Sequence, residues 1–258
     1  MKYWKQNTRL KINIVVSLLL QIVVFVSGIV LPRLFISIYG SKVNGLVASI
    51  QQFLGFITLG ELGIGAVVQY NLYKPLAEEQ WDKVSSIVLS ARRFFNRLVI
   101  GILIYVIFLA CLLPFKVAED FGYFYTASLV LAISFSYFMQ YYFGMAYKQL
   151  LDADQLSFVR IIPQIIQIIL NIVFSFWLIN LHFSIQKVKF VTSILYSIQP
   201  LVMYIFVNKY YKNLNLKKGI SGEPIKQKWN GIAQHIAAVV LKDTDIVVLT
   251  LFSTLENV

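Results

Sequence analysis

Residues 12–38 read INIVVSLLLQIVVFVSGIVLPRLFISI and contain a single charged residue, Arg33. A membrane-spanning helix needs about 20 apolar residues to cross the hydrocarbon core, and this run exceeds that length. Further apolar runs follow at 43–72, 98–115, 121–147, 158–181 and 188–207, and another begins near residue 231. The pattern of about ten alternating residues that marks a membrane β-barrel strand is absent, and helices satisfy the backbone polar groups in lipid. The sequence therefore predicts an all-α integral membrane protein, a polytopic bundle of six complete transmembrane helices and the start of a seventh.

The composition agrees with a membrane location. Of the 258 residues, 58% are apolar and 14% are charged, against about 45–50% and about 25% in ordinary soluble domains. The chain has one cysteine, Cys111, so it cannot form an internal disulfide. A soluble enzyme, a disordered chain and a secreted disulfide scaffold are excluded. The first apolar run is too long for the core of a signal peptide and is expected to remain as a helix.

The basic residues predict the orientation of the bundle. If the N-terminus is cytoplasmic, 17 of the 23 lysines and arginines fall in or near cytoplasmic segments. Five fall on the outer side, namely Arg33, Lys42, Lys116, Lys187 and Lys189. Cytoplasmic segments of membrane proteins are enriched in lysine and arginine, so we expect a cytoplasmic N-terminus. The net charge of +11 then reflects membrane topology and does not indicate nucleic-acid binding.

Two longer polar segments divide the chain. Residues 78–95 carry apolar side chains at helical spacing and predict an amphipathic helix lying in the membrane interface. Residues 209–229 combine lysines with Gly219, Gly222 and Pro224 and predict a flexible cytoplasmic linker. The expected organisation is a transmembrane lobe at 1–208, this linker, and the start of a second lobe at 230–258.

Arg33 and Glu61 place charge within predicted spans. Such charges cost at least about 2.5–3.5 kcal/mol at the middle of a membrane helix, so each needs a physical reason. Arg33 follows Pro32 near the outer end of its span, and its long side chain either reaches the interface or faces a central cavity and binds an anion. Glu61 lies in LGELGIG at 59–65, too far from either interface to reach it, among glycines that allow close helix contact or a local break. We interpret Glu61 either as a buried structural carboxyl or as a cavity-facing residue for coupling or ligand binding.

Two further polar groups lie in later spans. The seventh apolar run contains Lys242, Asp243 and Asp245. Lys242 and Asp245 share a helical face and can neutralise each other, whereas Asp243 points elsewhere. The fifth span carries a stripe of uncharged amides that either joins helices by hydrogen bonds or lines a polar cavity: Gln164, Gln167 and Asn171.

Catalytic patterns are scarce. The chain has two histidines, no HExxH motif and no Ser-His-Asp spacing. The charges within the membrane are few and spread over three helices, which favours a translocation path over a reaction centre. We therefore expect a protein that is not an enzyme and that holds no metal or cofactor.

Several sequence blocks resemble one transporter family. They are LPRLFISIYG at 31–40 with VNGL at 43–46, the glycine-rich segment at 51–65, LYKPLA at 72–77, LLDADQ at 150–155, and Thr244-Asp245. Together they resemble the N-terminal half of Wzx-type polysaccharide flippases of the multidrug/oligosaccharidyl-lipid/polysaccharide exporter superfamily. The resemblance covers nearly the whole chain.

The resemblance implies two helical lobes around a central cavity that opens alternately to each side of the bacterial cytoplasmic membrane. The substrate it implies is a polyprenyl-pyrophosphate-linked oligosaccharide for capsule or surface polysaccharide synthesis. The cavity-lining positions that carry over are Arg33, Glu61, Lys242, Asp243 and Asp245. Basic residues would bind pyrophosphate or acidic sugars, and a carboxylate would couple transport to H⁺ or Na⁺.

The family has a second lobe, and the seventh apolar run has only begun when the chain ends. We therefore expect an N-terminal fragment whose partners are the lipid bilayer, the lipid-linked oligosaccharide and a missing C-terminal lobe. One alternative is a drug/cation antiporter of the same superfamily. Another is a membrane-embedded polysaccharide polymerase or acyltransferase, but the predicted outer loops are too short to hold a catalytic domain.

Overall fold

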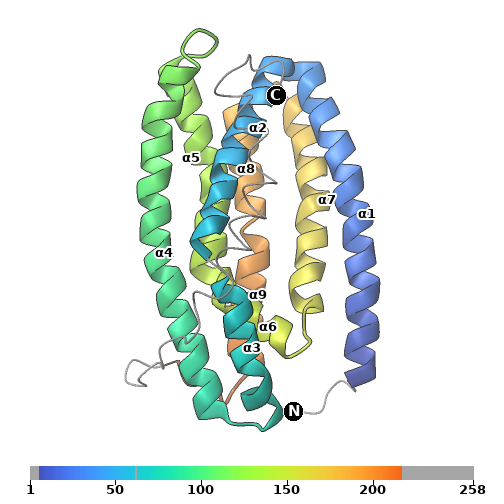
Figure 1. The fold of residues 1–258 in the computed structure, drawn as a ribbon. Helices are drawn as coiled ribbons and strands as arrows, with labels where there is room; N and C mark the ends of the chain where they lie inside the picture. The colour runs from blue at the N-terminus through green and yellow to red at the C-terminus, as the bar shows by residue number, and fades with distance from the viewer. Residues whose placement is uncertain (1–5, 62, 217–258) are drawn as a thin grey trace.

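The computed structural model describes residues 6–61 and 63–216, and within these ranges all regular structure is helical. The helices stand side by side as an elongated bundle (Figure 1). Three of them are continuous along most of its length: α1 (Gln6–Tyr39), α4 (Trp81–Lys116) and α7 (Phe158–Asn180). An all-helical membrane bundle was predicted, and the helical architecture is confirmed.

The other passes along the bundle are interrupted. One consists of α2 (Ser41–Gly55), the 3₁₀-helix η1 (Phe56–Glu61) and α3 (Ile64–Ala77). The next consists of α5 (Tyr123–Met139), a π-helical turn η2 (Gln140–Gly144) and α6 (Met145–Ala153). The last consists of α8 (Ile185–Leu195) and α9 (Ile198–Tyr210), joined by a turn. Interruptions of an α-helix by a 3₁₀ segment, a π-helical turn or a short turn often mark functional positions in membrane helices.

Among the described residues, five helical segments are long and apolar enough to cross a membrane: Asn7–Tyr39, Trp81–Lys116, Tyr123–Ala153, Phe158–Asn180 and Ile185–Tyr210. The second predicted span, at 43–72, is not among them. The break between α2 and α3 leaves helices of 15 and 14 residues. Gly63 caps α3 with a left-handed φ of 68°, a conformation that glycine adopts without steric cost. The path from α2 to α3 nevertheless runs from one end of the bundle to the other (Figure 1).

Residues 78–95 do not form a separate interfacial helix. Helix α4 is continuous over 36 residues, which at 1.5 Å per residue is about 54 Å and longer than the membrane core of about 30 Å. The apolar face of its first half is buried within the bundle, since Val84, Val88 and Ala91 are fully buried and Phe95 is 1% exposed. The helical periodicity at 78–95 is present as predicted, but the apolar face contacts protein and the helix continues directly into the predicted third span.

The surface of α1 is apolar on most sides. Leu18, Phe25 and Ile29 are each more than half exposed, although the helix lies beside α7 and α2. The buried core is formed instead by side chains of helices such as α2, α3, α4 and α6; Leu46, Ile50 and Leu150 are fully buried examples. An apolar surface of this size is expected on a face that lipid covers.

Candidate functional site

A cavity of about 470 Å³ lies inside the bundle between α1, α2, α5, α7 and α8. Its wall is unusually polar for a protein with so many apolar residues. The amides that line it are Asn44, Gln51, Gln140, Gln167, Asn171 and Gln199, and the hydroxyl groups are those of Ser27, Ser136, Tyr137, Thr192, Ser193 and Tyr196. Lys189 is the one charged residue in this lining, and none of the described lining residues is acidic.

Helical spacing brings these side chains to the cavity. On α7, Gln167 and Asn171 are four residues apart and lie on one face. On α8 and the turn that follows it, Lys189, Ser193 and Tyr196 are separated by four and three residues and form a second polar stripe. The two stripes face each other because α7 and α8 lie side by side.

Hydrogen bonds join the two stripes. The Asn171 amide donates to the Tyr196 hydroxyl at 3.1 Å, and the Gln167 Nε2 group donates to Gln199 Oε1 at 3.4 Å. Gln167 is 3% exposed, yet its Oε1 has no hydrogen-bond partner in the described part of the protein. A buried carbonyl without a donor costs about 1–3 kcal/mol, so this oxygen is a place where a donor from water or a ligand would be stabilising.

Lys189 carries the positive charge of the cavity. Its Nζ lies 4.0 Å from the centre of the Phe35 ring on α1, a cation–π contact that holds the ammonium group in place. Phe35 is itself 4% exposed. Within residues 6–61 and 63–216, no carboxylate forms an ion pair with Lys189. The ring face does not replace a hydrogen-bond acceptor, so the three N–H donors of the ammonium group remain available to a ligand.

Three amides on other walls are also available. Asn44, Gln51 and Gln140 line the cavity from α2 and η2, and their side-chain amides make no hydrogen bond with any described residue. Each amide offers two donor hydrogens and one acceptor oxygen. The cavity thus presents one cation and several unpaired amide groups to whatever occupies it.

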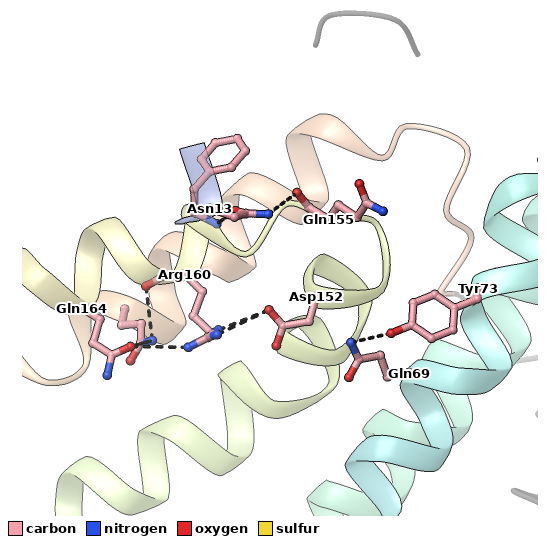
Figure 2. A network of polar contacts seen from close by, with 9 residues as sticks. Asn13, Gln69, Tyr73, Asp152, Gln155, Arg160 and Gln164 are labelled. Carbon is pink, nitrogen blue, oxygen red and sulfur yellow. Dashed lines mark hydrogen bonds and ion pairs between the residues drawn. The ribbon is translucent and has the colours of Figure 1, made fainter. Parts of the chain in front are cut away.

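A second polar cluster lies where α6 is followed by α7 (Figure 2). Arg160 Nε lies 3.5 Å from Asp152 Oδ1, and Arg160 Nη1 donates to Gln164 Oε1 at 3.4 Å. Gln199 donates to the same Gln164 oxygen at 3.4 Å and to the Arg160 carbonyl at 3.3 Å. Gln199 therefore links the cavity, through Gln167, to this ion pair.

The start of α1 is fastened to the same end of the bundle. Asn13 donates to the Gln155 carbonyl and accepts from the Phe158 backbone N–H, both at 2.9 Å, and so supports the turn between α6 and α7 (Figure 2). Arg9 forms an ion pair with Asp154 at 3.1 Å. The Tyr211 hydroxyl donates to the other carboxylate oxygen of Asp154 at 2.6 Å. Burial raises the pKa of Tyr211, and the neighbouring Asp154 carboxylate raises it further.

The residues predicted from the sequence do not gather in the cavity. Arg33 is exposed on α1 and is not part of the cavity lining, although its neighbours Pro32 and Phe35 are. Glu61 ends η1 at the helix break, and its side chain lies outside the described part of the structure. Lys242, Asp243 and Asp245 also lie outside the described residues. The role assigned to these five residues stays a prediction.

The polar stripe on the fifth predicted span fits its cavity-lining interpretation in part. Gln167 and Asn171 line the cavity, whereas Gln164 lies in the Arg160 cluster. Sequence reasoning missed Lys189, which it counted with the outer basic residues. The signal was present, because Lys189, Ser193 and Tyr196 are spaced for one helix face at the start of an apolar run.

Among the described residues, no group of three histidine, cysteine, aspartate or glutamate side chains is placed to hold a metal ion. Comparisons of the chain with protein-family models, curated proteins and solved structures gave no match.

Proposed function

We propose that this chain forms the N-terminal lobe of a transporter that moves polyprenyl-pyrophosphate-linked oligosaccharides across a bacterial cytoplasmic membrane for capsule or surface polysaccharide synthesis. The observation that carries the proposal is the polar cavity of about 470 Å³ inside an apolar bundle. Polar groups inside a membrane domain are costly and usually mark a path for a polar solute.

The chemistry of the cavity lining supports a sugar over a cationic drug. Amides and hydroxyls both donate and accept hydrogen bonds, as sugar hydroxyls do. A site for organic cations would need carboxylates or a cage of aromatic rings, and the described lining contains a lysine and no acidic residue. This feature disfavours the drug/cation antiporter, the main alternative within the same superfamily.

The interrupted helices support a moving bundle. Under this proposal the α2–η1–α3 path is a sixth crossing of the membrane, in addition to the five long apolar segments. Unwound turns inside membrane helices are tolerated where they are buried in protein or line a cavity. Such turns can act as hinges when a transporter opens alternately to its two sides.

The charged residues take complementary roles in the proposal. Arg33, exposed on α1 beside the cavity-lining residues Pro32 and Phe35, binds the pyrophosphate or an acidic sugar. Glu61, at the helix break, couples transport to H⁺ or Na⁺. Lys242, Asp243 and Asp245 contribute to the same path from the seventh apolar run.

Export of surface polysaccharide from cells tests the proposal, with the protein expressed from its complete coding sequence. Arg33→Ala and Glu61→Gln should each abolish surface polysaccharide at unchanged membrane abundance. Lys116→Ala and Glu119→Gln are matched controls, because they remove the same types of charge from exposed positions at the end of α4. Normal export by both test variants would remove the site assignment. Efflux of cationic dyes without any export defect in a deletion strain would replace the proposal by the antiporter.

A further inference from the structure

The cavity contains more recognition chemistry than a passage for water requires. Lys189 has an ammonium group held over Phe35 at 4.0 Å with no ion-pair partner among the described residues. Gln167 has a buried, unpaired Oε1 in the same lining. These two groups come from different helices. The ammonium group of Lys189 needs a hydrogen-bond acceptor, whereas the amide oxygen of Gln167 needs a donor.

The charge of the lining limits the ligand. A single lysine can neutralise about one negative charge, and an uncompensated charge in a low-dielectric site costs several kcal/mol. A pyrophosphate carries more than one negative charge and is best held by arginines, which bind its oxygens in pairs. The lining that the described residues form holds no arginine, so the pyrophosphate group of a lipid-linked substrate does not fit here.

The size and hydrogen-bonding capacity fit one sugar residue. Cavities of about 300–1,000 Å³ bind small organic ligands, and this one measures about 470 Å³. The side-chain amides of Asn44, Gln51 and Gln140, which line the cavity from α2 and η2, have no hydrogen-bond partner among the described residues. Sugar hydroxyls can pair with these amides as donors and as acceptors.

We infer that the cavity is a subsite for a sugar residue that carries one carboxylate, a uronic acid, with Lys189 as the counter-ion of the carboxylate and Gln167 as an acceptor for a hydroxyl group. The inference rests on the proposed function, which it deepens by naming an acidic class of sugar and the residue that selects it. Lys189 acts as a binding residue and takes part in no covalent step.

Equilibrium binding to the purified full chain in detergent tests the inference, with glucuronate, glucose and acetate as probes in calorimetric titrations. Glucuronate should bind at least ten-fold more tightly than glucose, because only glucuronate offers the carboxylate. It should also bind at least ten-fold more tightly than acetate, because acetate lacks the hydroxyls. Lys189→Gln should reduce the ratio of glucuronate to glucose affinity to about one, and Lys189→Arg should keep a preference for glucuronate. Lys187→Gln is the matched control, since Lys187 is exposed on the same helix, over the Phe183 ring, and should leave the ratio unchanged.

Each contrary result overturns the inference. If the wild type binds glucuronate and glucose with equal affinity, the site does not recognise the carboxylate charge. If it binds glucuronate and acetate with equal affinity, the site does not recognise the sugar ring and its hydroxyls. Retention of the ratio in Lys189→Gln would remove Lys189 from the site, while its glucose binding reports that the variant is folded. Tighter binding of inorganic pyrophosphate than of glucuronate would assign the cavity to the phosphate group. Because binding in detergent requires no transport, normal surface polysaccharide in a deletion strain together with intact glucuronate binding would overturn only the proposed function.

Discussion

Gly144 is the position where a single methyl group should test the packing between η2 and α9. It ends the π-helical turn η2 and lies against α9. A Cβ atom at this position would lie 3.1 Å from Cβ of Pro200 and 3.1 Å from Cε of Met203. The methionine end can move, but the proline ring is rigid, so the helices must shift by a few tenths of an ångström. Gly101 in α4 is the matched control, because a Cβ there meets nothing within 4 Å.

Both changes from glycine to alanine gain up to about 1 kcal/mol of helix propensity. Only Gly144→Ala also carries an overpacking cost of about 1–3 kcal/mol. The free energy of unfolding of Gly144→Ala should therefore lie about 2 kcal/mol below that of Gly101→Ala. For a chain of this size that difference corresponds to a melting temperature lower by about 4–8 °C.

Thermal unfolding in detergent, followed by size-exclusion chromatography with fluorescence detection, measures this difference. Gly144→Leu should lower the melting temperature further, because a larger side chain cannot be accommodated by Met203 alone. If Gly144→Ala and Gly101→Ala melt together, η2 and α9 are not in the close contact that the structure gives, and the reasoning is refuted.

Three further predictions concern the fastening of α1, its pH dependence and the orientation of the bundle. Arg9→Ala should lower the free energy of unfolding by about 1–3 kcal/mol, because it leaves the partly buried Asp154 without its cation, whereas exposed Lys11→Ala should change little in the same thermal assay. Wild-type stability should fall as pH rises above about 10, since tyrosine ionises near that pH in the unfolded chain, while burial and Asp154 keep Tyr211 protonated in the folded protein. Melting temperatures between pH 8 and 11 should therefore fall less steeply for Tyr211→Phe than for the wild type, and equal slopes would show that Tyr211 is not the group concerned. In a Cys111→Ser background, a membrane-impermeant maleimide should label Glu119→Cys in intact cells and Asp82→Cys only after lysis. The reverse pattern would place the N-terminus outside. Labelling of both cysteines from one side would mean that α4 does not cross the membrane.

Hydropathy predicted the long helices well and their interruptions poorly. The span expected at 158–181 appears as α7, Phe158–Asn180, because its apolar run is bounded by polar turns at both ends. The glycines at 59–65 in the run at 43–72 allowed either close helix contact or a local break, and the sequence alone did not decide between them; the structure has the break, between α2 and α3. The face of residues 78–95 was recognised, but periodicity does not say whether lipid or protein covers an apolar face.

The cavity could be predicted only one helix at a time. The spacing of Gln167 and Asn171 on α7 is a property of the sequence alone, and both side chains line the cavity. The contact between Lys189 and Phe35 joins residues more than 150 positions apart, and it depends on which helices are neighbours in the bundle. Lys189 follows the predicted outer loop, so the topology alone counts it with the outer basic residues, and only the three-dimensional arrangement places it in the cavity lining.

The two ends of the interior differ in how firmly they are held. At the start of α1, the ion pair of Arg9 with Asp154 measures 3.1 Å and the hydrogen bond from Tyr211 to Asp154 measures 2.6 Å. Beside the cavity, the side-chain hydrogen bonds from Gln167 to Gln199 and from Gln199 to Gln164 both measure 3.4 Å, beyond the usual range for a strong N–H···O bond. The cavity end also keeps an unpaired Gln167 oxygen and a lysine without a counter-ion among the described residues. A ligand that satisfies these groups therefore lowers the energy of the cavity end and leaves the Arg9–Asp154 end unchanged. Under the proposed function, this difference lets substrate binding drive one end of the lobe to rearrange while the other end stays closed.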